Sequence, residues 1–305
     1  METDKASSLP ADLLRELADI GPRWAEDVSS HVRQMARAFG PLLAAAPKVS
    51  RIERDQAYGP HPRHRLDVYH PDIGAPMRGP ALVFVHGGAF VQGDRNSTDE
   101  IYANVMHRFA RSGIVGINVE YRLAPEATFP GASEDVAAAI AWTRANAERL
   151  GVDADRIVLM GHSAGAAHAA SYAYDRRLHP AEGPGLAGLI VVSGRVRADT
   201  APDNPNAAKV ETYYGSSDPA ILDAASAVSH VDAGSPPTFI AYAEYENPLL
   251  DVYCLELAYR LAAAKRRAPP VVRLAGHNHT SIIAHINTSE DRLAQAILAF
   301  IAGLK

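Results

Sequence analysis

The stretch Gly161–Gly165, GHSAG, places a serine between two glycines. An apolar run precedes Ser163 and an alanine-rich helical segment follows it, so the serine falls on a predicted strand-to-helix turn. Such a turn exposes the hydroxyl of a nucleophilic serine, and small residues two positions to either side avoid collisions with the strand and the helix. A helix-capping serine is the alternative. The strand before and the helix after favour a nucleophile.

A second glycine-rich turn, FVHGGAF at residues 84–90, ends another predicted strand. Adjacent glycines leave backbone N–H groups uncovered, as an oxyanion hole requires. We predict that Gly87 and Gly88 donate from one side of a substrate carbonyl, and that the N–H of Ala164 at the helix start donates from the other. A plain flexible turn is the alternative. His86 is expected to brace this loop rather than to transfer protons.

A proton acceptor for Ser163 is expected near the C-terminus, where His277 and His279 follow the last predicted strand. Their spacing would also suit a metal pair. However, zinc sites need three or four ligands, and no cysteine or carboxylate cluster stands nearby in the sequence. We therefore expect a base here and neither a metal nor an organic cofactor. The histidines of residues 61–70 are expected to be solvated.

The third catalytic group should be a carboxylate from residues 243–253, AEYENPLLDVY. Glu246 lies directly after a predicted strand, where such an acid belongs, and is our candidate; Asp251 is the alternative. Glu244 falls inside the strand. Asn247 precedes a proline and is predicted to be the N-cap of the next helix. Asp251 would then lie in the opening turns of that helix, where its dipole favours a carboxylate.

The elements that must position these residues alternate between strands and helices, which predicts a mostly parallel sheet covered by helices on both faces. Continuous aliphatic runs indicate strands buried on both sides. Helices are expected at 134–151, with Gly151 as its stop, and at 290–303, with Ser289 as its N-cap. The strands are expected at 65–71, 81–88, 113–122, 156–163, 186–194, 237–245 and 270–279.

Two further segments flank this alternation. Residues 1–47 are predicted to be helical and to be closed by Pro41 and Pro47. Residues 195–236 are rich in Pro, Asn and Ser and are predicted to form an excursion over the sheet edge. The apolar stripe of the first segment comprises Trp24, Val28, Val32, Met35, Phe39 and Leu42.

Four motifs, HGGAF, YRLAPE, GHSAG and the AEYxxPL region, resemble the hormone-sensitive-lipase branch of the α/β-hydrolase esterases. The resemblance runs from about Arg65 to Phe300. It implies an α/β-hydrolase fold for residues 48–305, with residues 1–47 and part of 195–236 as a cap over the active site. It also implies that His279, rather than His277, is the catalytic histidine.

The chain departs from this family pattern in two places. His162 stands where many members carry Asp. The acid region reads Glu-Asn-Pro where Asp-Pro is usual, and counting back from the proline would put Asn247 in the acid position.

Composition restricts the partners. The chain has 305 residues, a net charge of −5 and a pI near 6.2, which argues against a nucleic-acid partner. The basic run 265–267 is expected at a solvated helix end. The single cysteine, Cys254, excludes an intramolecular disulfide and is expected in the core. No signal-like N-terminus or long apolar window is present, so the sequence predicts a soluble, cytoplasmic protein without a membrane partner.

Together these residues predict a carboxylic-ester hydrolase that works through an acyl-enzyme. Ser163 attacks, His279 transfers the proton and Glu246 orients the histidine. Small apolar acyl or aryl esters are the expected substrates, and a homo-oligomer is possible. Formamide, aryl-amide or lactone hydrolysis on the same residues is the first alternative. A non-catalytic small-molecule receptor is the second.

Overall fold

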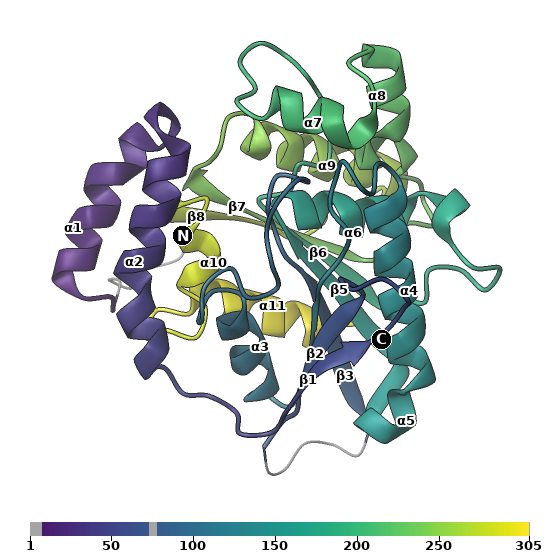
Figure 1. The fold of residues 1–305 in the computed structure, drawn as a ribbon, viewed down its shortest axis with the longest axis horizontal. Helices are drawn as coiled ribbons and strands as arrows, with labels where there is room; N and C mark the ends of the chain where they lie inside the picture. The colour runs from purple at the N-terminus through teal and green to yellow at the C-terminus, as the bar shows by residue number, and fades with distance from the viewer. Residues whose placement is uncertain (1–7, 73–77, 305) are drawn as a thin grey trace.

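The computed structural model describes residues 8–72 and 78–304. In this part of the chain a single eight-stranded sheet forms the centre of the molecule (Figure 1), in the order β1-β2-β4-β3-β5-β6-β7-β8. The pairs β1–β2 and β2–β4 are antiparallel, and all other neighbours are parallel. The predicted mostly parallel sheet is thus confirmed.

All seven predicted strands are present, and an eighth, β1, was not predicted. Its sequence, IERDQA, is polar and lacks the apolar pattern of a buried strand. It lies at the sheet edge, where pairing with β2 alone requires no buried face. The strands are Ile52–Ala57 (β1), Arg65–Tyr69 (β2), Gly79–Val85 (β3), Val115–Val119 (β4), Val152–His162 (β5), Gly188–Val192 (β6), Thr238–Tyr245 (β7) and Val271–Asn278 (β8).

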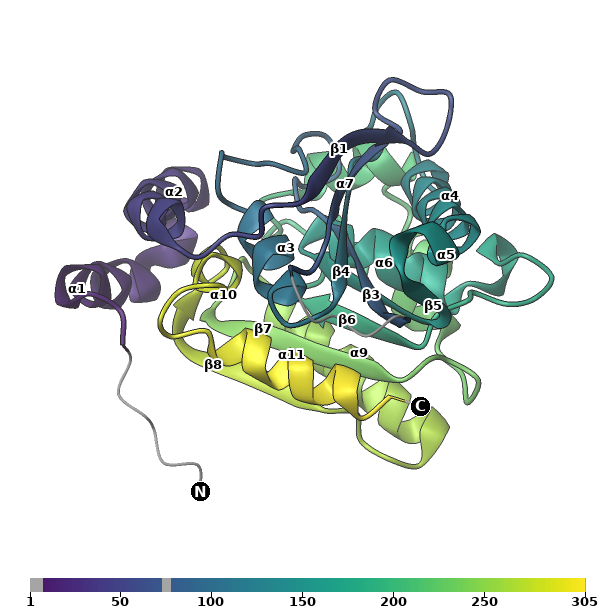
Figure 2. The same cartoon turned by 90° about the horizontal axis from the view of Figure 1, so that it is seen from below.

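The helices lie on both faces of the sheet (Figure 2), as predicted. One face carries α4, α6 and α9, and the other carries α3 and α11 together with the N-terminal helices. The α-helices are Ala11–Ile20 (α1), Val28–Ala45 (α2), Ala103–Ala110 (α3), Gly131–Ala145 (α4), Ala147–Leu150 (α5), Ala164–Tyr174 (α6), Ala207–Tyr214 (α7), Pro219–Ala225 (α8), Leu250–Lys265 (α9), Ser281–Ala284 (α10) and Arg292–Ala302 (α11). Three 3₁₀ segments are Gly21–Glu26 (η1), Arg176–Leu178 (η2) and Ala227–His230 (η3).

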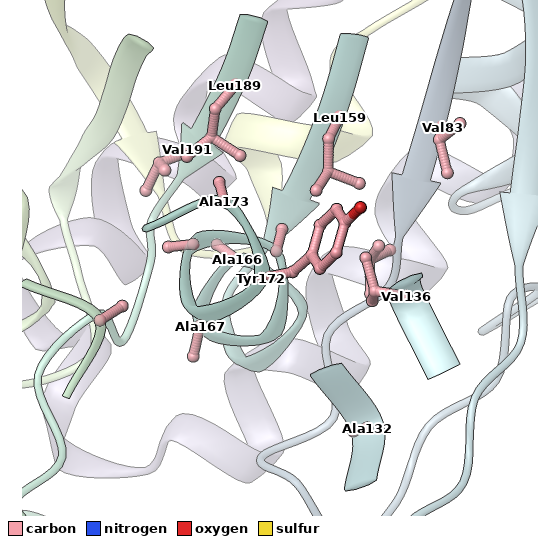
Figure 3. Close-up of a cluster of buried hydrophobic side chains, with 14 of the residues drawn as sticks. Val83, Ala132, Val136, Leu159, Ala166, Ala167, Tyr172, Ala173, Leu189 and Val191 are labelled. Carbon is pink, nitrogen blue, oxygen red and sulfur yellow. The ribbon is translucent and has the colours of Figure 1, made fainter. Parts of the chain in front are cut away.

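The first core lies between the sheet and α4 and α6 (Figure 3). Val83, Leu159 and Leu189 on neighbouring strands are fully buried there. The helix α6 contributes small side chains, among them Ala166 and Ala167, which let its backbone approach the sheet closely. This close approach fixes the start of α6, and with it the turn that carries Ser163.

The second core covers the opposite face and includes the N-terminal segment. Met35 and Phe39 of α2 are fully buried, as the predicted stripe requires, whereas Val28, Val32 and Leu42 are only partly buried. The helices α1 and α2 lie beside β8 and α10 (Figure 2), and η1 packs on β7 and β8. The N-terminal segment is therefore placed against the end of the sheet that carries His279.

Predicted helix boundaries in the N-terminal and C-terminal segments are wrong. The helix α2 continues to Ala45, so Pro41 lies inside it instead of closing it. The helix α11 begins at Arg292 with Asp291 in the N-cap position, whereas the Ser289 hydroxyl donates to the carbonyl of Ser8. The helix predicted at 134–151 is divided at Asn146 into α4 and α5, and Gly151 ends α5 in a left-handed conformation with φ of 69°, so only its role as the stop is confirmed.

Residues 195–236 contain α7, α8 and η3 and are anchored to the first core. Val210, Tyr213 and Leu222 are each at most 2% exposed. These contacts hold the excursion against the body of the molecule. Within the described residues, no helix combines the length and apolarity needed to cross a membrane.

Candidate active site

Ser163 occupies the predicted sharp turn between β5 and α6. Its φ and ψ are 57° and −123°, a combination that L-residues rarely adopt. A side chain at Gly161 would place its Cβ 2.5 Å from the Cα of Ala166, and one at Gly165 would lie 2.2 Å from the carbonyl oxygen of Val85. Both positions therefore require glycine if the turn is to pack against the neighbouring strand and helix.

The hydroxyl of Ser163 lies next to His279, which in turn lies next to Glu246. The distance from Ser163 Oγ to His279 Nε2 is 3.0 Å, and that from His279 Nδ1 to Glu246 Oε2 is 2.6 Å. The three residues follow the carboxyl ends of β5, β8 and β7, which meet at one edge of the parallel sheet. A hydrogen-bonded serine, histidine and carboxylate are the groups needed for nucleophilic acyl transfer.

The carboxylate of Glu246 is fixed by two donors from neighbouring segments. Its Oε1 accepts a short hydrogen bond from the hydroxyl of Ser193, which follows β6, and a 2.8 Å bond from the N–H of Ala243. These bonds leave Oε2 directed at His279. Sequence reasoning missed Ser193; its position at the end of a buried strand was the available signal.

The other residues of the acid region point elsewhere. Glu244 pairs with Arg273 at 2.8 Å on β8. Asp251 lies in the first turn of α9, as expected. The prediction for Asn247 is wrong: α9 begins at Leu250, and Asn247 Oδ1 instead accepts a 2.8 Å hydrogen bond from Trp24 Nε1. A tertiary contact with the N-terminal segment has taken the place of a local cap.

The glycine-rich loop after β3 faces Ser163, but its N–H groups differ in availability. The N–H of Gly87, expected to be an oxyanion donor, donates to the Tyr102 hydroxyl at 3.2 Å. Among the described residues no acceptor engages the N–H groups of Gly88, Ala89 or Ala164. Gly88 has φ of 148°, and a Cβ there would lie 1.8 Å from the carbonyl oxygen of Gln92, so only glycine fits. Ala89 was not among the predicted donors.

His162 connects the turn that carries Ser163 to Tyr102 and to the loop of His279. Its Nε2 lies 3.1 Å from the carbonyl oxygen of His279, and its Nδ1 lies 3.1 Å from the Tyr102 hydroxyl. With a proton on Nε2, the directions of the three hydrogen bonds are consistent: the Gly87 N–H donates to Tyr102, the Tyr102 hydroxyl donates to Nδ1, and Nε2 donates to the carbonyl of His279. Burial, and then the proximity of His279, lower the pKa of His162 well below its usual value, so the ring is neutral.

The remaining candidate histidines lie outside this constellation. His86 is fully buried, stacks on Tyr121 and lies 3.1 Å from Glu120, an arrangement that braces the loop. His277 Nε2 faces a Glu290 oxygen at 3.2 Å, away from Ser163. In the part of the chain that the structure describes, no group of three or more His, Cys, Asp or Glu residues could hold a metal ion.

Three buried residues complete the comparison with the sequence expectations. His64 and His70 are 8% and 3% exposed and bond Asp135 and Glu53, so the prediction that this histidine segment is solvated is wrong for both. Cys254 is fully buried in α9, in the core as predicted, and burial raises the pKa of its thiol.

A cavity of about 380 Å³ lies in front of Ser163 and His279. Side chains of α2, among them Val28, Val32 and Arg33, the loop after β3, and Asn206 and Lys209 at the start of α7 form its walls. Thus both flanking segments, the N-terminal helices and the 195–236 excursion, contribute to the cavity. Its size is in the range of small-molecule sites.

Comparisons with known proteins find relatives with ester-hydrolase names. The protein family described as BD-FAE matches residues 66–184. The chain is 30% identical over 226 residues to "Esterase LipQ" of Mycobacterium tuberculosis, covering 64% of this chain and 49% of that protein. It is 40% identical over 105 residues to "Ethyl acetate hydrolase" of Pseudomonas putida, covering 33% and 32%. The chain thus spans half or less of the length of these curated relatives.

Solved structures match over nearly the whole chain. The esterase of Pyrobaculum calidifontis has a TM-score of 0.73 and 27% identity, covering 96% of this chain and 98% of that one. A thermostable carboxylesterase cloned from a metagenomic library has a TM-score of 0.71 and 26% identity, covering 92% and 98%. The fold is that of an α/β-hydrolase. The chain belongs to this superfamily and resembles its hormone-sensitive-lipase-like carboxylesterases.

Proposed function

We propose that this protein hydrolyses carboxylic esters through an acyl-enzyme. The observation that carries the proposal is the hydrogen-bonded series from Ser163 through His279 to Glu246. As Ser163 Oγ attacks the ester carbonyl carbon, His279 Nε2 takes the hydroxyl proton. The tetrahedral intermediate then expels the alcohol, which receives that proton. Water attacks the acyl-serine in the same way and releases the acid, and Glu246 stays ionised to stabilise the imidazolium.

For the oxyanion hole we propose the N–H groups of Gly88, Ala89 and Ala164. They lack protein acceptors in the described residues, whereas the N–H of Gly87 is engaged by Tyr102. A donor that is already free costs no hydrogen bond when negative charge develops on the substrate oxygen. Gly87 would then act indirectly, by fixing the loop.

We propose that the N-terminal helices, with part of residues 195–236, form the cap of the site, and that residues 48–305 form the catalytic domain. In support, Val28 and Val32 of α2 and Lys209 of α7 line the cavity beside Ser163. The walls that α2 supplies are largely apolar, which suits a small acyl or aryl group.

The amide and lactone alternatives gain no support from the relatives reported above, which carry ester-hydrolase names. A receptor without catalysis has no need of the serine–histidine–carboxylate geometry. A cytoplasmic location, a homo-oligomer and the absence of nucleic-acid partners stay predictions.

Steady-state hydrolysis of short 4-nitrophenyl esters tests the proposal. His279→Ala should be nearly as damaging as loss of the serine, because residues of such a unit act together. His277→Ala is the matched control, since its ring faces Glu290. Equal losses in both variants, or the reverse ranking, would show that His279 is not the residue that transfers the proton.

A further inference from the structure

Two cationic side chains line the cavity beside Ser163. Arg33 comes from α2 and Lys209 from α7, so the two reach the cavity from different segments. Within the described residues, neither side chain makes a hydrogen bond or ion pair. By contrast, Arg122 is paired with Asp135 at 2.6 Å.

No carboxylate offsets these charges in the cavity. Its walls contain neither Asp nor Glu among the described residues. The acids of the adjoining loops, Asp94, Asp99 and Asp203, do not line it. A cleft lined by one sign of charge focuses its field and raises the local concentration of ligands of the opposite sign. The cavity is therefore biased toward anions although the whole chain carries a net charge of −5.

The position of Lys209 is unfavourable for the helix that carries it. Lys209 is the third residue of α7, and a cation in the first turn opposes the helix dipole. No acidic residue in that turn compensates, and the Asn206 side chain makes no capping hydrogen bond. Helix stability thus gives no reason for a lysine here, whereas a ligand in the adjoining cavity does.

We propose that the substrates of this site are esters that carry a negative charge, such as a free carboxylate, away from the scissile bond. Arg33 and Lys209 would bind that charge while Ser163 attacks the ester carbonyl. The proposal rests on the ester-hydrolase function proposed above and adds its substrate class. The chemistry of hydrolysis is unchanged, because the charged group takes no part in bond making or breaking.

The experiment compares substrate pairs that differ chiefly in charge. For the acyl side, the pair is mono-4-nitrophenyl adipate and 4-nitrophenyl hexanoate. For the alcohol side, it is 4-carboxyphenyl acetate and 4-(methoxycarbonyl)phenyl acetate. The ratio of kcat/KM for the anionic member to that for the neutral member is measured for the wild type, Arg33→Gln, Lys209→Gln and the double variant. Arg37→Gln is the matched control, because Arg37 is exposed on the same helix but does not line the cavity.

Because solvent screens charge pairs near a protein surface, we expect each single variant to lower the ratio for one substrate pair about three- to tenfold. The double variant should lower this ratio further. Arg33→Lys and Lys209→Arg keep the positive charge and should retain most of the wild-type ratio. Higher ionic strength should lower the wild-type ratio, whereas Arg37→Gln should leave it unchanged. The pair that responds shows on which side of the ester the charge lies.

An unchanged ratio in the double variant for both pairs would overturn the proposal, as would an equal fall in Arg37→Gln. Failure of the underlying function has a different signature. In that case the neutral esters would not be hydrolysed, or their hydrolysis would survive Ser163→Ala. Serine-dependent hydrolysis of neutral esters without any charge effect would remove only the substrate class.

Discussion

Glu246 has two carboxylate oxygens in different surroundings. One is held by Ser193 and the N–H of Ala243, and the other faces His279. Glu246→Gln removes the negative charge that stabilises the imidazolium, so we expect kcat to fall on the order of 10³-fold or more. Asp251→Asn changes a carboxylate in the first turn of α9 and should chiefly lower stability. Kinetics and thermal melting of both variants provide the measurement.

A near-normal Glu246→Gln enzyme beside a severely impaired Asp251→Asn enzyme would move the role of the acid to Asp251.

Sequence reasoning reached Glu246 because the acid is expected directly after the preceding strand. It could not predict that Asn247 binds Trp24, since that hydrogen bond joins positions 223 residues apart. It also did not single out Ala89, whose N–H has no acceptor among the described residues, because the availability of an N–H depends on the folded contacts of the loop.

His162 is a positioning residue in this account, since it joins Tyr102 and the backbone of His279. We expect His162→Ala to lower kcat about tenfold with little change in KM, because two hydrogen bonds worth ~1 kcal/mol each no longer fix the catalytic loops. Tyr102→Phe should give a smaller loss of the same kind. A fall in melting temperature with unchanged kcat would show that His162 is only structural.

At the scale of elements, the N-terminal segment is held to the catalytic edge of the sheet by η1. Trp24 is 1% exposed and bonds Asn247, the neighbour of Glu246. Gly21 lies so close to Tyr245 that a Cβ there would be 2.4 Å from the ring. Movement of the N-terminal helices would thus displace Tyr245 and Asn247, the two neighbours of the proposed acid Glu246.

A double-mutant cycle tests this attachment. Trp24→Phe and Asn247→Ala each remove one partner of the buried hydrogen bond, so each should cost ~1–3 kcal/mol in free energy of unfolding. The double variant should cost clearly less than their sum. Urea unfolding measures these values, and KM should rise in each variant because α2 lines the cavity. Strictly additive costs would show that the two side chains do not interact.

The elements also show why some boundaries were predictable and others were not. Continuous aliphatic runs predict buried strands such as β5 and β6. The polar edge strand β1 carries no such signal. The cap predicted at Ser289 failed because its hydroxyl bonds Ser8, a contact that only the folded chain brings together.

At the scale of the whole molecule, several histidines are buried in their neutral form. Burial, and then the proximity of His86, lower the pKa of His168 to about 3; burial, and then the proximity of His277, lower that of His285 to about 3. Between these values and the unfolded pKa of ~6.5, the unfolded chain binds more protons than the folded one. Their stabilising contribution is therefore complete above pH ~6.5 and is lost as the pH falls below it.

His168→Phe tests this dependence. Among the described residues, neither ring nitrogen of His168 has a hydrogen-bond partner, and its neighbours include Phe90 and Tyr213. Urea unfolding between pH 4 and pH 7 should show a slope against pH that is shallower by ~1.4 kcal/mol per unit, the effect of one proton. An unchanged slope in His168→Phe would contradict the prediction.

The central claim, that Ser163 is a nucleophile activated by His279, is tested most directly by covalent labelling. A fluorophosphonate probe should add one phosphonyl group to the wild-type chain at neutral pH, on the peptide that contains Ser163, because His279 lies 3.0 Å from its hydroxyl. Intact-mass and peptide-mass spectrometry of the wild type and Ser163→Ala give the answer. We expect a complete loss of labelling in Ser163→Ala. Equal labelling of both proteins, or an absence of labelling in the wild type, would contradict the claim.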